Sequence, residues 1–268
     1  MRVREVVAPL AGTEAGRQQL AMGAGGDRTM ELDRAAEAVV FEELQALADR
    51  GVRFSVLSEE VGLRSFGAPL PLVVVDPVDG SLNAKQGIPF YNVMVALLDG
   101  PAVGDAKVGC IVNIVSGERW TAIKGQGARR NGRPITVIPR ERDDRIQLLG
   151  LESSTRSLGA AARLIERSSK VRILGAMALS MAHTAAGALD AFCAPVPMRV
   201  FDMTAGLLIL GETGGVATDV NGRSLEALEC TLQTRTTLLC APDADSHALA
   251  LRAFAGDAHA EINNLGSR

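Results

Sequence analysis

The sequence lacks any hydrophobic segment long enough to cross a membrane and lacks a leader-like start. Its longest weakly polar stretch, Ile173 to Ala182, is far shorter than the roughly 20 apolar residues that a membrane helix needs. The first twenty residues mix charges with short apolar patches, without the continuous apolar core of a signal peptide. We therefore expect a cytoplasmic protein with no membrane partner.

The sequence also lacks clusters of like charge. No run of five or more like charges occurs, and the formal net charge of the 268 residues is -3. A surface for nucleic acid or for an anionic membrane is therefore not expected, and a small molecule is the favoured ligand.

Cysteine is scarce and widely scattered. The four cysteines form no CxxC pair and match no structural zinc spacing, so we expect buried free thiols: Cys110, Cys193, Cys230 and Cys240. No GxxxxGK[ST] motif is present, and the GAGG at 23–26 follows an expected helix instead of a strand. A nucleotide-cradling loop is therefore poorly supported.

The elements that are present change character along the chain. Helices are expected over Val3–Leu20 and over Thr29–Arg50, where apolar residues recur at helical spacing. Apolar runs with short turns from Phe54 to Val137 predict a largely antiparallel sheet. Arg140–Asp144 is interpreted as the joint between an N-terminal half, 1–143, and a C-terminal half, 144–268. Beyond it, strands alternate with helices expected at 157–168, 176–186 and 202–213, which is typical of α/β layering.

The octapeptide DPVDGSLN follows the apolar run Leu72 to Val75. Pro77 pushes Asp76 toward an extended conformation and Gly80 permits a tight turn, so Asp76 and Asp79 should lie close together at the end of a strand. Two adjacent carboxylates are costly without a cation between them, and Mg²⁺ takes such oxygen ligands, including the carbonyl of Val78. A plain surface turn is the alternative, because Asp, Pro and Gly are common turn residues.

Further acidic residues follow other expected elements. Glu59 and Glu60 end a strand-like run, and Asp202 lies where an apolar strand meets a helix. Taken singly, Asp202 is better interpreted as the N-cap of that helix, and Asp33 as a solvent-facing helix carboxylate. Their functional interpretation depends on the whole set.

Together these segments resemble the inositol monophosphatase family, which consists of Mg²⁺-dependent, lithium-sensitive sugar phosphatases. The likeness covers nearly the whole chain through GGDRTMELD, SEE, DPVDGSLNAKQGIPFYNVMVAL, GAMAL and VFDMTAGLLILGETGG. SEE, NAKQGIPFY and RVFD are most similar to the archaeal-type branch, whose members often hydrolyse both inositol 1-phosphate and fructose 1,6-bisphosphate.

The resemblance implies a layered αβαβα fold, of mixed α+β and α/β character, in a homodimer. It implies two or three Mg²⁺ ions, which Mn²⁺ can replace, on the ligands Glu59, Asp76, Val78, Asp79 and Asp202. It implies that Asp33 and Ser81, with Glu59, orient and deprotonate the attacking water. The implied substrate contacts are Asp79, Gly80, Ser81, Arg172, Gly175, Ala176 and Arg199.

Elementary chemistry agrees with this implication. A phosphate monoester is doubly negative, so a carboxylate cluster would repel it unless metal ions reverse the local charge. Mg²⁺ can also activate water and stabilise the leaving alkoxide, so no protein nucleophile is required. His183, His247 and His259 are accordingly interpreted as structural.

The other end of the substrate is less defined by the sequence. The stretch APVPMRV has no acidic residue at the position where animal members hold inositol hydroxyls with a Glu, which argues against strict inositol specificity. Arg172 and Arg199 could pair with a second phosphate, and an ordinary surface arginine is the alternative for each. Two other functions stay open: a phosphatase of 3'-phosphoadenosine 5'-phosphate or NADP, and a regulatory RNA-polymerase-associated role.

Overall fold

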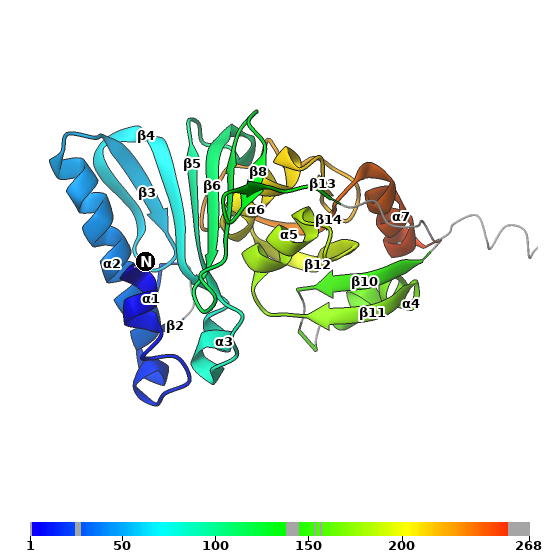
Figure 1. Cartoon of the computed structure of the whole chain (residues 1–268), viewed down its shortest axis with the longest axis horizontal. Helices are drawn as coiled ribbons and strands as arrows, with labels where there is room; N and C mark the ends of the chain where they lie inside the picture. Colours follow the sequence, from blue (N-terminus) through cyan, green and yellow to red (C-terminus); the bar gives the residue numbers. More distant parts are fainter. Residues whose placement is uncertain (1, 25–27, 138–144, 153, 156, 257–268) are drawn as a thin grey trace, which may run out of the picture.

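The computed structural model describes residues 2–24, 28–137, 145–152, 154–155 and 157–256 as five layers of helices and sheets (Figure 1). From left to right in Figure 1 these are an outer helix pair, a seven-stranded sheet, a central helix pair, a five-stranded sheet and a second outer helix pair. The alternation of layers lets each sheet bury both of its faces against helices.

The first two layers come from the N-terminal half. Helices α1 (Arg2–Val7) and α2 (Glu31–Asp49) cover one face of the large sheet. Its strands, in spatial order, are β3 (Phe54–Ser58), β4 (Gly62–Asp79), β5 (Asn92–Leu98), β6 (Ala106–Asn113), β7 (Arg119–Ile123), β8 (Ala128–Arg130) and β9 (Arg133–Pro134). The predicted antiparallel pattern holds from β4 to β9.

Strand β4 is the exception to that pattern. Its first part forms a hairpin with β3, pairing Gly62 with Ser58, and its second part returns parallel to β3, pairing Val75 with Ser58. The second part is the predicted LVVV run, and it is buried from Val74 to Val78. The long apolar run therefore forms an interior strand that continues through DPVD and ends at Asp79, directly before the turn at Gly80.

The remaining layers come mostly from the C-terminal half. The central helices are α5 (Met177–Ala185) and α6 (Thr204–Glu212). The second sheet has the order β11 (Ser168–Ile173), β10 (Ile146–Leu151), β12 (Ala191–Arg199), β14 (Arg235–Ala241) and β13 (Val216–Thr218). Helices α4 (Ala162–Glu166) and α7 (Ala244–Ala255) cover its outer face.

One hydrophobic cluster joins the two halves. It packs β4 to β7 against α5, α6 and the inner face of the second sheet, with Trp120, Phe192 and Phe201 fully buried at 0% exposure. The predicted joint at Arg140–Asp144 and the boundary at 143/144 lie outside the described residues. Strand β9 ends at Pro134 and β10 begins at Ile146, so each sheet belongs to one half while the central core belongs to both.

The prediction of one helix over Val3–Leu20 is wrong. Helix α1 ends at Val7, just before Pro9, which lacks the N–H that a continuing helix would use. The chain then turns at Gly12, whose φ is +73°, and forms strand β1 (Gln19–Met22), which pairs with β2 (Arg28–Met30). Pro9 and Gly12 therefore end the helix well before Leu20.

The other predicted helices are present within a few residues of their expected ends. Thr29–Arg50 corresponds to α2, 157–168 to η3 (Leu158–Ala161) followed by α4, and 176–186 to α5. The region 202–213 begins as the short helix η4 (Phe201–Met203) and continues as α6. Within the described part of the chain, no helix combines the length and the apolar character needed to cross a membrane.

Candidate functional site

The predicted acidic residues converge on one small cavity. The cavity has a volume of about 130 Å³ and is lined by Asp33, Glu59, Glu60, Asp76, Val78, Asp79, Gly80, Ser81, Arg199 and Asp202. Helix α2, the ends of β3, β4 and β12, the start of the short helix α3 (Ser81–Gln86) and η4 each contribute to it. Six carboxylates thus surround a space of a few water molecules with a single arginine among the lining residues.

Asp76 is the most enclosed of these carboxylates. It is 3% exposed at the end of the buried part of β4, and its Oδ1 accepts a hydrogen bond of 2.9 Å from the backbone N–H of Val78. Burial raises the pKa of Asp76 well above its ordinary value, and the nearby charges of Glu59, Asp79 and Asp202 raise it further. Keeping this carboxyl buried lowers the stability of the folded protein. A destabilising buried carboxyl is typical of a functional group.

Asp79 connects the two halves of the molecule. Its Oδ1 accepts from the N–H of Met177 at 3.0 Å, and its Oδ2 accepts from the N–H of Ala178 at 2.8 Å. Oδ2 also accepts from Nδ2 of Asn92 at 2.6 Å. Burial raises the pKa of Asp79, although these three hydrogen bonds act in the opposite direction. The DPVD loop is therefore anchored to the start of α5, an attachment that the sequence did not reveal.

Gly80 has no room for a side chain. Its φ is +87°, and a Cβ atom would lie 3.0 Å from both the Ala176 side chain and the Gly175 carbonyl, and 3.1 Å from the carbonyl of Phe90. The predicted neighbours Gly175 and Ala176 are thus in direct contact with the loop. The close approach keeps Ser81 at the cavity wall.

Gly80→Ala is expected to lower the free energy of unfolding by about 2–4 kcal/mol, because a left-handed conformation and a clash with backbone atoms are combined. Gly132→Ala is the matched control. Gly132 has a φ of +80° but nothing within 4 Å of its Cβ position, so it isolates the conformational part of the cost. Equal losses of stability in urea unfolding of the two variants would contradict the proposed close packing.

Further acidic residues, on α2 and after β3, are held in place by hydrogen bonds. Asp33 Oδ2 accepts from the N–H of Met30 at 3.0 Å at the start of α2, and burial raises its pKa to about 7. Glu37, which the sequence reading did not single out, accepts from Ser58 Oγ at 2.5 Å. Glu60 accepts from the hydroxyl of Thr29. Asp33 is buried and lines the cavity, so it does not face the solvent.

Asp202 is not the helix N-cap that its sequence position favoured when taken alone. It lies inside η4, and α6 begins after Met203 with no side-chain cap. Its Oδ2 accepts from Nε of Arg199 at 2.9 Å, whereas its Oδ1 is buried and has no hydrogen-bond partner among the described residues. Burial raises the pKa of Asp202 to about 7, against the lowering effect of Arg199.

Arg199 links two carboxylates from opposite halves of the chain. Besides Asp202 it contacts Glu59, with 2.6 Å between Nη1 and Oε1. Burial by itself lowers the pKa of Arg199, but Asp202 and Glu59 outweigh it and keep the guanidinium charged. The cation thus holds one oxygen of each carboxylate and leaves the other for a different partner.

The donor set fits a hard divalent cation. The side-chain oxygens of Glu59, Asp76, Asp79 and Asp202 lie around one cavity, and no sulfur or imidazole is among its lining groups. Within the described residues, no three acidic, histidine or cysteine side chains already form a ligand cluster. The Oδ1 of Asp202 is buried and has no hydrogen-bond partner among the described residues, and a bound cation would supply one.

The raised pKa values give the metal-free protein an unusual pH dependence. Asp33 and Asp202 have pKa values of about 7, so between about pH 4 and 7 the folded state binds more protons than the unfolded state. The stability that these two carboxyl groups contribute is therefore fully present at low pH, and it is lost as the pH rises through 7. In EDTA we expect Tm at pH 8 to be about 5 °C or more below Tm at pH 5.

Adding Mg²⁺ should stabilise the protein more at pH 8 than at pH 5, because ionised carboxylates bind it. Scanning calorimetry at both pH values, with EDTA or Mg²⁺, measures this. A higher Tm at pH 8 than at pH 5 in EDTA would contradict the expectation.

Several other predicted residues lie outside the carboxylate cavity. Arg172 is exposed on β11 and its guanidinium donates to the Val171 carbonyl, so the structure does not bring it to the cavity. His183 is half-buried against Phe90 and Trp120, and the buried His247 contacts the Thr218 hydroxyl, in agreement with structural roles. His259 lies outside the described residues. The cysteines are free, and all except the half-buried Cys110 are buried.

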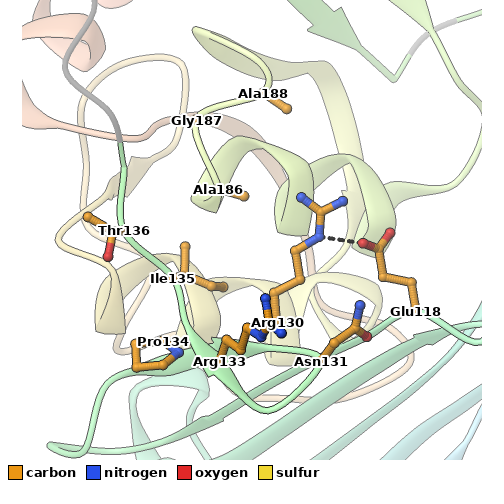
Figure 2. A pocket seen from close by; sticks show the side chains of 10 residues that line it. All are labelled: Glu118, Arg130, Asn131, Arg133, Pro134, Ile135, Thr136, Ala186, Gly187 and Ala188. Atoms are coloured by element: carbon orange, nitrogen blue, oxygen red, sulfur yellow. Dashed lines mark hydrogen bonds and ion pairs between the residues drawn. The ribbon is translucent and has the colours of Figure 1, made fainter.

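A larger cavity lies at the opposite end of α5. It has a volume of about 940 Å³, and Figure 2 shows it between Ala186–Ala188 and the loop carrying Arg130, Asn131 and Arg133. Its principal charge pair, Arg130 with Glu118, is already formed. None of the predicted site residues lines it, so size does not identify the functional site here.

A model of the inositol monophosphatase family matches residues 3–257. The chain belongs to the inositol monophosphatase family. The resemblance noted in the sequence is therefore confirmed, together with the layered fold and the phosphatase class that it implied.

Two relatives and one solved structure illustrate the likeness. The fructose-1,6-bisphosphatase/inositol-1-monophosphatase of Methanothermobacter thermautotrophicus is 34% identical over 259 residues, covering 92% of this chain and 90% of that protein. The bifunctional NADP phosphatase/NAD kinase of Methanococcus maripaludis is 30% identical over 258 residues, covering 89% of this chain but 45% of that longer protein. The extragenic suppressor protein SuhB of Bartonella henselae superimposes with a TM-score of 0.80 at 27% identity, covering 96% and 95% of the two chains.

Proposed function

We propose that this inositol monophosphatase family member is a Mg²⁺-dependent phosphomonoesterase that acts on inositol 1-phosphate and fructose 1,6-bisphosphate. The observation that carries the proposal is the convergence of six carboxylates on one cavity beside Gly80 and Ser81. The name of the 34% identical relative supports the choice of these two substrates.

The roles of the residues follow from their positions. Glu59, Asp76, Asp79 and Asp202, with the carbonyl of Val78, would hold the metal ions. These ions would supply the charge that draws in a phosphate dianion and the acidity that activates water. Arg199 holds one oxygen each of Glu59 and Asp202, and the first amides of α5 hold both oxygens of Asp79, so these contacts fix the carboxylates around the cavity.

The protein's own groups then position the reactants. Gly80 allows the backbone to approach the phosphoryl group closely, and Ser81 offers its hydroxyl at the same wall. Asp33 lines the same cavity, where its carboxylate can accept a proton from the attacking water. Gly175 and Ala176 border the side on which the leaving alcohol would lie.

A nucleotide phosphate is the second candidate substrate, and the NADP phosphatase relative favours it. The same residues would perform the hydrolysis, and only the alcohol part of the substrate would differ. An assay must therefore compare both substrate classes.

The test is phosphate release from inositol 1-phosphate, fructose 1,6-bisphosphate, NADP and 3'-phosphoadenosine 5'-phosphate, each with Mg²⁺ and with EDTA. We expect the two polyol phosphates to be hydrolysed fastest, only with Mg²⁺, and not measurably by Asp79→Asn. Asp99→Asn is the matched control, since Asp99 is exposed and pairs with Lys107 at the surface. Equal rates for wild type and Asp79→Asn would refute the proposal, and faster release from NADP would select the nucleotide alternative.

A further inference from the structure

Glu152 is a carboxylate that the metal site does not use. It follows the last residue of β10, and its backbone N–H donates to the carbonyl of Cys193 at 2.9 Å. β10 runs parallel to both of its neighbours, β11 and β12, so Glu152 lies at the carboxyl edge of this part of the sheet. Ligands of open α/β sheets bind at that edge.

The side chain of Glu152 belongs to the inner face of the sheet. Leu149 and Leu151 pack into the outer cluster under α4 and α7, whereas Leu148 packs into the central cluster with α5. Because side chains alternate between the faces of a strand, Glu152 shares the face of Leu148. That face is the one covered by α5, whose first amides hold Asp79.

Two observations place the carboxyl of Glu152 near the site. Burial raises the pKa of Glu152 to about 7, and the nearby charge of Asp79 acts in the same direction. The pairing of Leu151 with Ile173 puts Glu152 level with Leu174, whose carbonyl accepts from Asn83 on α3 at 2.7 Å. Glu152 therefore lies beside the Gly175–Ala176 corner, where the leaving alcohol is proposed to lie.

The carboxyl lacks any visible structural purpose. Its Oε2 is buried and has no hydrogen-bond partner among the residues that the structure describes. A buried oxygen without a partner lowers stability, so a structural role does not explain it. A ligand that donates a hydrogen bond to Oε2 would explain why the carboxyl is there.

We propose that Glu152 is a substrate-binding residue that accepts a hydrogen bond from a hydroxyl of the alcohol portion of a polyol phosphate. This inference rests on the proposed phosphatase function and adds a specificity determinant to it. A carboxylate only accepts hydrogen bonds, and vicinal hydroxyls are the donors that inositol and fructose phosphates carry. The neighbouring segment from Ala194 to Val200, mostly on β12, contains no acidic residue. Glu152 thus supplies an acidic group beside it from the end of β10.

The test compares Glu152→Gln and Glu152→Leu with wild type on two substrates. For inositol 1-phosphate we expect KM to rise about threefold in the Gln variant and at least about tenfold in the Leu variant, with kcat changed less than about twofold. For p-nitrophenyl phosphate, which has no hydroxyl, both constants should stay within about twofold. Tm of Glu152→Leu without substrate should rise by about 2–4 °C, because leucine leaves no unpartnered polar atom at this position.

The outcomes separate the possible explanations. Glu166→Gln, which removes an exposed carboxylate of the same half, should change neither KM nor Tm. A lowered Tm with unchanged KM would show that Glu152 is structural, and equal KM increases for both substrates would show a general disturbance of the site. Either result overturns the inference. A wild-type protein that hydrolyses p-nitrophenyl phosphate but no polyol phosphate overturns the proposed substrate instead.

Discussion

Asp76→Asn is expected to lower kcat/KM for Mg²⁺-dependent phosphate release by at least about 10³-fold, equivalent to about 4 kcal/mol, and to make the metal-free protein more stable. The amide keeps the acceptor oxygen that receives the Val78 N–H. It removes a charge that burial and three neighbouring carboxylates disfavour. The two effects have opposite signs because the same charge that costs stability would bind the metal.

The measurement pairs steady-state kinetics with calorimetry. Titration of Mg²⁺ into metal-free protein should show loss of at least one binding event in Asp76→Asn, while Tm in EDTA rises by several degrees. A variant that retains more than a tenth of wild-type activity, or that melts earlier in EDTA, would show that Asp76 is structural. Asp99→Asn should again behave like wild type, since its carboxylate is exposed.

The sequence predicted that these carboxylates lie close together, because several of them stand at the ends of elements. Asp76 and Asp79 follow an apolar strand, and Glu59 follows another, so local patterns and the family resemblance place them together. The error over Asp202 has the same origin. Its local position suits an N-cap, whereas its actual partner, Glu59-bound Arg199, depends on contacts between distant segments.

Residues with purely tertiary roles could not be found this way. Asn92 lies in a strand and Glu37 in a helix, and neither belongs to a recognisable sequence motif. Only folding brings Asn92 to Asp79 and Glu37 to Ser58. Glu152 carries no motif either, and its significance depends on burial and on the absence of a partner among the described residues. These roles depend on how distant segments pack against one another. The spacing of residues along a single sequence does not indicate such packing.

Arg199→Met is expected to destabilise the metal-free protein by about 3–5 kcal/mol, which corresponds to a fall in Tm of about 10 °C. The guanidinium is the cation that compensates Glu59 and Asp202, and its own side chain is 15% exposed. Methionine fills similar space but leaves both carboxylates uncompensated. Mg²⁺ should restore much of the lost Tm, because it supplies positive charge to the same pair.

Arg199→Lys separates charge from geometry. A lysine keeps the charge but cannot reach Glu59 and Asp202 through two fixed N–H groups, so we expect stability to be recovered only in part. If Arg199 instead bound a second phosphate, its replacement would raise KM for fructose 1,6-bisphosphate far more than for inositol 1-phosphate. Because the guanidinium already holds Glu59 and Asp202, we expect equal losses of kcat/KM on both substrates. A loss confined to the bisphosphate would show that Arg199 leaves the carboxylates to bind substrate.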